Sequence, residues 1–131
     1  MFLTKERDYA VRIVRCLADM ELKAVKTICD REHIPQPFAY KILKRLERSG
    51  IVSSQRGAAG GYVLKRPIES LTLLDVVGTI EGHLVLNECL KTGVDCPNNP
   101  CDNKCGVHVE LVRVQKLLVD ALTEKKMDEI I

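Results

Sequence analysis

The hydrophobic residues of the first fifty positions repeat with the three- or four-residue spacing of amphipathic helices. This spacing predicts a helix from Thr4, a typical capping residue, to about Met20. Its apolar stripe consists of Ala10, Ile13, Val14 and Leu17. A second, shorter helix is predicted over residues 25–32. Cys16 in the first helix and Cys29 in the second are expected to be core residues, because a buried thiol behaves as a small hydrophobic group.

A third helix is predicted within the segment HIPQPFAYKILKRLERSGIV. Pro37 suits its first position, where no N–H is needed, and Gly50 suits the position just after its end. The buried face is predicted to be Ala39, Ile42, Leu43 and Leu46. Two helices joined by a turn at Pro35, the second with a basic face, describe a helix-turn-helix, although a generic helical hairpin has the same periodicity. The residues of this helix expected to face DNA are Gln36, Phe38, Tyr40, Lys41, Lys44, Arg45 and Arg48.

The next segment, IVSSQRGAAGGYVLKRP, predicts a β-hairpin with strands over 51–55 and 62–65 and a glycine-rich tip. A hairpin that directly follows a recognition helix is a wing. We expect Arg56 to reach into a minor groove, and Lys65 and Arg66 to contact phosphates. The alternative is an ordinary hairpin whose charged side chains are only solvated.

The second half of the chain predicts two more helices with a loop between them. Thr72 and Asp75 give a capping-box start to LTLLDVVGTIEG, which is predicted to end at Gly82. The Gly-, Pro- and Asn-rich segment that follows is predicted to be a loop. One long helix is then predicted over residues 107–131. Its apolar seam is Val107, Leu111, Val114, Leu118 and Leu122. Such a helix is expected to pair with a second copy in a homodimer; packing against its own chain alone is the alternative.

These elements predict a mostly α protein with a small β-hairpin, in one compact domain of 131 residues. A winged helix-turn-helix DNA-binding region is expected over 1–82, a cysteine-rich loop over 83–106, and a dimerisation helix and tail over 107–131. The first residues do not form a secretory signal, and no run approaches the roughly 18 apolar residues of a membrane helix, so we expect no membrane contact and a cytoplasmic protein.

Charge is concentrated where DNA is expected. The net charge is +2, but residues 40–66 hold seven Lys and Arg against one acid, Glu47, which is +6. A run of charge is usually a solvated face, but this one coincides with the helix-turn-helix and the wing. We therefore expect double-stranded DNA as the partner.

The loop holds four of the six cysteines, Cys89, Cys96, Cys101 and Cys105, and His108 follows three residues later. In a reducing compartment clustered thiols more often hold metal than form disulfides. The spacings match neither a zinc ribbon nor a bacterial ferredoxin, so spacing leaves zinc and an iron–sulfur cluster equally open. An enzyme is not expected, since no nucleophile–base or acid pair is evident, and an electron carrier would not need the helix-turn-helix.

Almost the whole chain resembles the Rrf-type winged-helix regulators, the family of the iron–sulfur regulators IscR, NsrR and RirA. The resemblance lies in LTKERDYAVR, LERSGIVSSQRGAAGGYVLKRP, LTLLDVVGTIEG and the loop cysteines. It implies a homodimeric transcription factor, which we expect to be a repressor. It also implies that a [2Fe–2S] or [4Fe–4S] cluster sensing nitric oxide, redox or iron status controls operator binding. A zinc- or thiol-based regulator without a cluster is the alternative.

The same resemblance implies the ligands by position. Cys89 and Cys96 match the first two cysteines of the family, and Cys105 best matches the third, because C-G-V-H repeats the C-x-x-H that ends the loop. The fourth ligand stays open among Cys101, His108 and Asp8 of the partner subunit. The other two histidines, His33 and His83, are expected on the surface.

Overall fold

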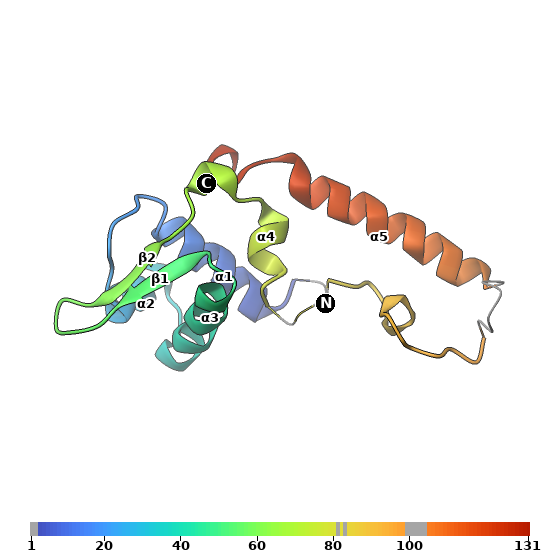
Figure 1. The fold of residues 1–131 in the computed structure, drawn as a ribbon, viewed down its shortest axis with the longest axis horizontal. Helices are drawn as coiled ribbons and strands as arrows, with labels where there is room; N and C mark the ends of the chain where they lie inside the picture. The colour runs from blue at the N-terminus through green and yellow to red at the C-terminus, as the bar shows by residue number, and fades with distance from the viewer. Residues whose placement is uncertain (1–2, 81, 83, 99–104) are drawn as a thin grey trace.

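The computed structural model describes residues 3–80, 82, 84–98 and 105–131 (Figure 1). Its elements are α1 (Lys5–Cys16), α2 (Val25–Glu32), α3 (Gln36–Arg48), β1 (Val52–Gln55), β2 (Gly61–Leu64), η1 (Ile68–Ser70), α4 (Leu73–Val77), η2 (Glu88–Leu90), α5 (Gly106–Glu124) and η3 (Met127–Glu129), where η marks a 3₁₀ turn. The predicted fold class, mostly helical with a two-stranded antiparallel hairpin and a long C-terminal helix, is confirmed.

One hydrophobic core lies between α1, α2, α3, the hairpin and α4. The predicted apolar faces of α1 and α3 are buried in it: Ala10, Ile13, Val14, Leu17, Ala39, Ile42, Leu43 and Leu46. Each buried Leu, Ile or Val side chain contributes roughly 1.5–3 kcal/mol relative to an exposed one. This packing fixes the direction of α3, so its opposite face points to solvent.

The hairpin is held to the helical body by a third extended segment. Val52 pairs with Leu64 at one end of the ladder and Gln55 with Gly61 at the other. The backbone of Lys23 exchanges two hydrogen bonds with Tyr62, of 2.9 and 2.8 Å. A Cβ at Gly61 would lie 2.1 Å from the carbonyl oxygen of Lys23, so only glycine fits at this position. The wing therefore has a fixed position beside the helix-turn-helix.

Several predicted boundaries in this region differ from the structure by one to four residues. The first helix ends at Cys16 instead of Met20, which adopts a left-handed conformation with φ 62° in the turn that follows. The third helix begins at Gln36, so Pro37 occupies its second position, where a missing N–H also costs no helical bond. The strands are Val52–Gln55 and Gly61–Leu64, so the end at Gln55 is as predicted and the other three ends differ by one residue.

The helix that starts at Thr72 is also shorter than predicted. The capping box between Thr72 and Asp75 is present, but the helix ends at Val77 instead of Gly82. The hydroxyl of Thr79 donates to the carbonyl of Val76 at 2.8 Å, a local bond that competes with further helical turns.

The largest departure is at the C-terminus, where the predicted helix does not continue through residue 131. It ends at Glu124, and Lys126 forms an antiparallel bridge with Thr72. The N–H of Met127 donates to the carbonyl of Leu71 at 2.8 Å, and the Met127 side chain is fully buried in the core. Figure 1 shows the result: α5 projects from the body, while the C-terminal tail returns to it.

Within the part of the chain that the structure describes, no helix is both long and apolar enough to cross a membrane.

Candidate nucleic-acid interface and metal centre

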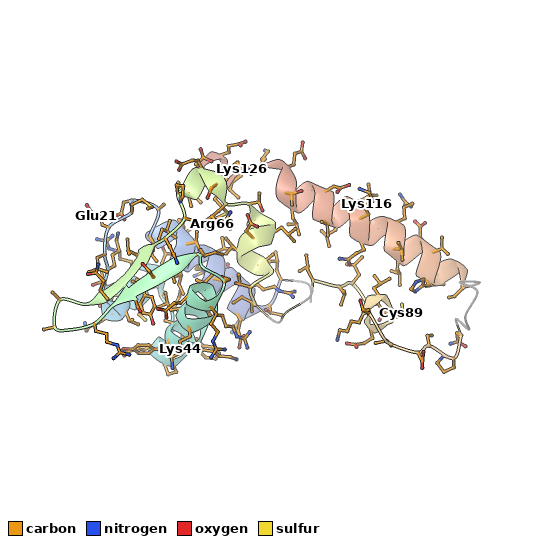
Figure 2. All side chains as sticks on the ribbon, in the orientation of Figure 1. Glu21, Lys44, Arg66, Cys89, Lys116 and Lys126 are labelled. Atoms are coloured by element: carbon orange, nitrogen blue, oxygen red, sulfur yellow. The ribbon has the colours of Figure 1, made fainter. Side chains whose placement is uncertain are left out.

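The outward face of α3 carries the basic side chains that the sequence predicted. Lys41, Lys44 and Arg48 are exposed, opposite the buried face of the helix. Figure 2 shows Lys44 pointing away from the body of the protein. Three cations on one exposed helix face suit the phosphates that border a DNA groove.

A hollow of about 490 Å³ lies between the first turns of α3 and the hairpin. Gln36 and Tyr40 line it from the helix side and Arg56 from the hairpin side. A Cβ at Gly60 would lie 2.3 Å from the carbonyl oxygen of Gln55, so the hairpin tip needs glycine to fold back this tightly. The structure thus brings Gln36 and Tyr40, two of the residues expected to face DNA, and Arg56, the predicted minor-groove arginine, to one concave surface.

Three other predicted DNA-facing residues, Phe38, Lys41 and Arg45, lie on the opposite flank of α3, towards α1. The exposed ring of Phe38 meets Tyr9 edge-on, with 6.0 Å between ring centroids. Glu6 bonds to Lys41 Nζ at 2.7 Å and lies 3.7 Å from Arg45 Nη1. Sequence reasoning missed Glu6, because its partners are 35 and 39 residues away and no local pattern points to them.

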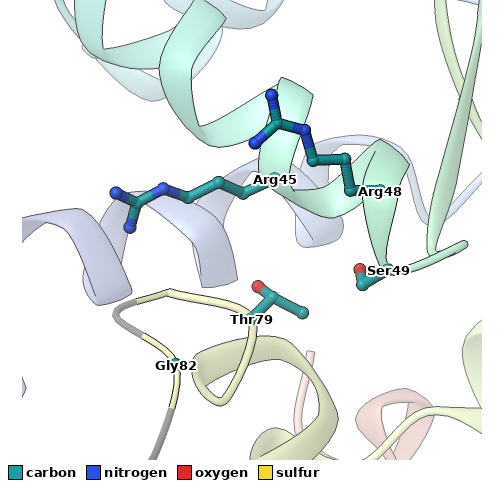
Figure 3. A pocket seen from close by; sticks show the side chains of 5 residues that line it. All are labelled: Arg45, Arg48, Ser49, Thr79 and Gly82. Atoms are coloured by element: carbon teal, nitrogen blue, oxygen red, sulfur yellow. The ribbon is translucent and has the colours of Figure 1, made fainter.

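Arg45 and Arg48 also border a second hollow, of about 500 Å³, together with Ser49, Thr79 and Gly82 (Figure 3). The two hydroxyls already donate to backbone carbonyls of Leu46 and Val76, each at 2.8 Å. Among the described residues that line this hollow, the guanidinium groups are therefore the side-chain donors left to hold an anion.

The two basic residues after the wing behave differently from each other. Lys65 is exposed, as the predicted phosphate contact requires. Arg66 is half-buried and donates to the carbonyl of Ser70 at 3.1 Å, with Asp75 at 3.8 Å. Arg66 therefore stabilises the turn before α4. Its expected contact with phosphate stays a prediction.

The first loop cysteine lies in the turn η2, which packs against α5. Asn87 Nδ2 donates to Cys89 Sγ at 3.6 Å, while Asn87 Oδ1 accepts from the N–H of Glu88 at 2.9 Å. Cys96 is half-buried further along the loop. Donation of N–H groups to sulfur is a common feature around metal-bound thiolates.

Cys105 caps the N-terminus of α5, and its Sγ accepts from the N–H of His108 at 3.5 Å. The N-terminus of a helix favours negative charge, so this position suits a thiolate. The Nδ1 atom of His108 is buried and has no hydrogen-bond partner among the described residues. A buried imidazole nitrogen without a partner is a suitable metal ligand.

The described residues fit a soft metal centre by their donor chemistry, but they do not already form one. Among residues 3–80, 82, 84–98 and 105–131, no three His, Cys, Asp or Glu side chains converge on one point. Cys101 and His83 lie outside the described residues. Asp8 lies on α1, half-exposed, and pairs with Arg12 at 2.9 Å.

The remaining cysteines are structural, as predicted. Cys16 is buried and Cys29 packs against the core. Burial raises the pKa of both thiols, which keeps them protonated and unreactive. His33 is exposed at the end of α2, also as predicted.

The apolar seam predicted along α5 is divided between two surroundings. Leu111, Leu118 and Leu122 are half-buried against their own chain, through contacts of α5 with α4 and η2. Val107 and Val114 are exposed, and so is the neighbouring Leu117, with 69% exposure at Val107 and 55% at Leu117. Part of this helix is thus covered intramolecularly, and an apolar strip remains uncovered.

The chain is similar to a known protein family, to known proteins in sequence and to a solved structure. The sequence profile of the Rrf2 family, described as iron-dependent transcriptional regulators, matches residues 3–131. Protein aau3 of Rhizobium meliloti is 34% identical over 134 residues, which cover 100% of this chain and 85% of that protein. The transcriptional regulator NsrR of Oceanobacillus iheyensis is 30% identical over 129 residues, 95% of this chain and 88% of that protein. The structure is similar to CymR, the global cysteine regulator of B. subtilis, with a TM-score of 0.73, 21% identity and coverage of 97% and 93% of the two chains.

Proposed function

The chain belongs to the Rrf2 family of transcriptional regulators, and from this premise we propose that it is a dimeric repressor whose operator binding is controlled by an iron–sulfur cluster. The family confirms that it is a regulator and not an enzyme. The observation that carries the DNA-binding part is the exposed basic face of α3 beside a glycine-tipped wing, with Gln36, Tyr40 and Arg56 around one hollow.

On this proposal α3 enters a major groove and the wing tip follows the adjacent minor groove. Gln36 and Tyr40 read base edges, and Arg56 inserts where the minor groove is narrow. Lys41, Lys44 and Arg48 contact phosphates along the major groove. In a dimer the two recognition helices would meet a two-fold symmetric operator.

Loss of Arg56 or Lys44 should weaken DNA binding in two distinguishable ways. Arg56→Ala should cost on the order of 1–3 kcal/mol of operator affinity, because it removes a groove contact. Lys44→Ala should lower the slope of log K against log salt by about 1, because one phosphate contact is lost. Fluorescence anisotropy across a salt series measures both.

The control is Lys116→Ala, which removes the same charge from an exposed site on α5 where Lys116 pairs with Asp120 (Figure 2). This variant should bind the operator like the wild type. Unchanged affinity in both Arg56→Ala and Lys44→Ala would remove the wing and α3 from the proposed interface.

The proposed cluster ligands are Cys89, Cys96 and Cys105. The N–H···S contacts at Cys89 and Cys105 support thiolates at both positions. A bound cluster would supply iron that reacts with nitric oxide or oxygen. The assembly of the cluster would depend on the supply of iron. The fourth ligand is Cys101, His108 or Asp8 of the partner subunit, and the buried, unpartnered Nδ1 of His108 in the described chain favours His108.

The uncovered strip of α5 supports the dimer. An apolar hollow of about 530 Å³, lined by Leu3, Val11, Leu73 and Ile130, lies beside the start of α1, and Asp8 is on its border. If the strip that contains Val107 and Leu117 packs into this hollow of a second copy, each Asp8 approaches the loop of the other subunit. Burial of the strip would remove the cost of its exposure to water.

Purification without oxygen tests the cluster directly. The protein should be brown, absorb in the visible sulfur-to-iron region, and contain iron and acid-labile sulfide. A colourless protein that retains zinc would contradict the cluster. It would favour the second candidate, a thiol- or zinc-based regulator, which draws support from loop cysteines that do not converge within the described residues and from the likeness to CymR.

A further inference from the structure

Gln115 is the polar member of the half-buried face of α5. It lies between Leu111 and Leu118, one helical turn from each, on the side that faces its own chain. An apolar residue at this position would continue the stripe of leucines. A buried amide is unfavourable unless its hydrogen-bonding groups are paired, so its two partners explain why glutamine is tolerated here.

Both ends of the Gln115 amide bond to the backbone of the segment that leads into the cysteine loop. The Oε1 atom accepts from the N–H of Leu86 at 2.9 Å, and the Nε2 atom donates to the carbonyl of Leu84. Residues 84–86 belong to no helix or strand, so the Gln115 side chain supplies backbone hydrogen bonds that a neighbouring strand would otherwise make. Two bonds from one planar group fix both the position of this segment along α5 and its orientation.

These two bonds also determine where Cys89, the first loop cysteine, lies. Cys89 follows Leu86 by three residues, in the turn η2 that packs against α5. Cys105 and His108 lie at the N-terminal end of the same helix, two to three turns from Gln115. A segment fixed at Leu84 and Leu86 therefore holds Cys89 beside the helix that carries Cys105 and His108.

We propose that Gln115 is a positioning residue for the metal site: its amide holds the segment 84–90, which carries Cys89, against α5. This inference rests on the proposed function, because the site is the proposed cluster site. Gln115 contacts no metal ligand itself and acts only through the backbone of Leu84 and Leu86.

The test compares Gln115→Met, which keeps the size of the side chain and removes both bonds, with Gln115→Glu, which keeps the acceptor for Leu86. Lys116→Met is the matched control at the next, exposed position. In the cluster-free protein, hydrogen exchange at the Leu86 amide and alkylation of Cys89 are measured by mass spectrometry or NMR. In the reconstituted protein, visible circular dichroism reports the ligand geometry of the cluster.

Gln115→Met should speed Leu86 exchange and Cys89 alkylation by up to about tenfold, since a net hydrogen bond is worth roughly 1 kcal/mol. Cys29, whose thiol packs against the core, should stay unreactive in every variant. Gln115→Glu should restore the protection of Leu86. The circular dichroism of the cluster should change in Gln115→Met and not in Lys116→Met.

Any other result would overturn either the positioning role of Gln115 or the proposed function. Leu86 exchange and Cys89 alkylation equal to those of Lys116→Met would overturn the positioning role. So would faster exchange with an unaltered cluster spectrum, because Gln115 would then be an ordinary packing contact. A wild type that takes up no cluster, while Gln115→Met still loosens Cys89, would refute the proposed function and leave the placement of Cys89 by Gln115 intact.

Discussion

Replacing Cys105 by serine is expected to abolish cluster assembly while leaving the fold intact. Three thiolates provide most of the bonding to an iron–sulfur cluster, and a serine hydroxyl is a much poorer ligand for iron. Cys105 is also the N-cap of α5. Serine is a favoured N-cap, so the variant keeps the helix start and removes only the soft ligand. Iron and sulfide in the anaerobically purified variant should fall at least about tenfold, with an unfolding midpoint close to that of the wild type.

The control is Cys29→Ala, which changes a thiol that packs against the core outside the loop. It should lose some stability and retain the cluster. A cluster that survives in Cys89→Ser or Cys105→Ser would show that the ligand assignment is wrong. If instead both variants lose it, DNA binding of loaded and unloaded protein can be compared, and equal affinities would end the sensor proposal.

The fourth ligand can be identified in the same way. Of Cys101→Ser, His108→Ala and Asp8→Ala, only the variant that removes the true ligand should form a cluster that is altered in spectrum and lost more quickly in air. A thiolate at this position would give a sturdier cluster than nitrogen or oxygen, because the softer ligand binds iron more strongly. The buried Nδ1 of His108 leads us to expect the largest change in His108→Ala.

The elements predicted well are those whose signal is local. The apolar stripe Ala10, Ile13, Val14 and Leu17 and the matching stripe of α3 are fully buried, because helical periodicity depends only on neighbours three and four residues away. The glycines of the wing were also informative. Gly60 and Gly61 would each place a Cβ within 2.3 Å of a backbone oxygen, so the constraint that selects glycine is the fold itself.

The features that escaped prediction depend on partners far along the chain. Glu6 bonds to Lys41 across 35 residues, and Gln115 bonds to Leu84 across 31. A glutamine among leucines was visible in the sequence as an exception, but nothing in the sequence identified its partner. The ends of α4 and α5 were misplaced for a related reason, since apolar residues beyond Val77 and Glu124 continue the helical pattern although they pack elsewhere.

Met127 is the clearest such case, and its replacement should have the largest effect on stability. The side chain is fully buried among core residues contributed by the winged half of the chain. Met127→Ala should lower the free energy of unfolding by about 2–5 kcal/mol, because it leaves a cavity where neighbouring side chains relax only in part. Denaturant unfolding at a fixed protein concentration measures the loss, since the stability of a dimer depends on concentration.

Two variants separate this packing effect from a general effect of the tail. Met127→Leu conserves volume and should cost less than about 1.5 kcal/mol. Ile131→Ala, an exposed position four residues later, should cost almost nothing. A loss in Met127→Ala no larger than that in Ile131→Ala would mean that the tail is not anchored in the core.

On the proposed function, the same anchor would link the cysteine loop to the DNA-binding region. Lys126 pairs with Thr72, the N-cap of α4, and Met127 bonds to Leu71, so the C-terminal end of α5 is joined to the segment between the wing and α4. On the proposed function, a cluster bound by the loop cysteines would act on the other end of this helix. We therefore expect Met127→Ala to bind operator DNA almost equally with and without cluster, even though Met127 lies in neither the loop nor the DNA-binding face, because a loosened anchor cannot transmit a shift of α5. The measurement is the operator affinity of the cluster-loaded and cluster-free forms of Met127→Ala, taken below the unfolding transition. If these two affinities differ by as much as they do in the wild type, the coupling would lie in the dimer contact of α5 and not in its tail.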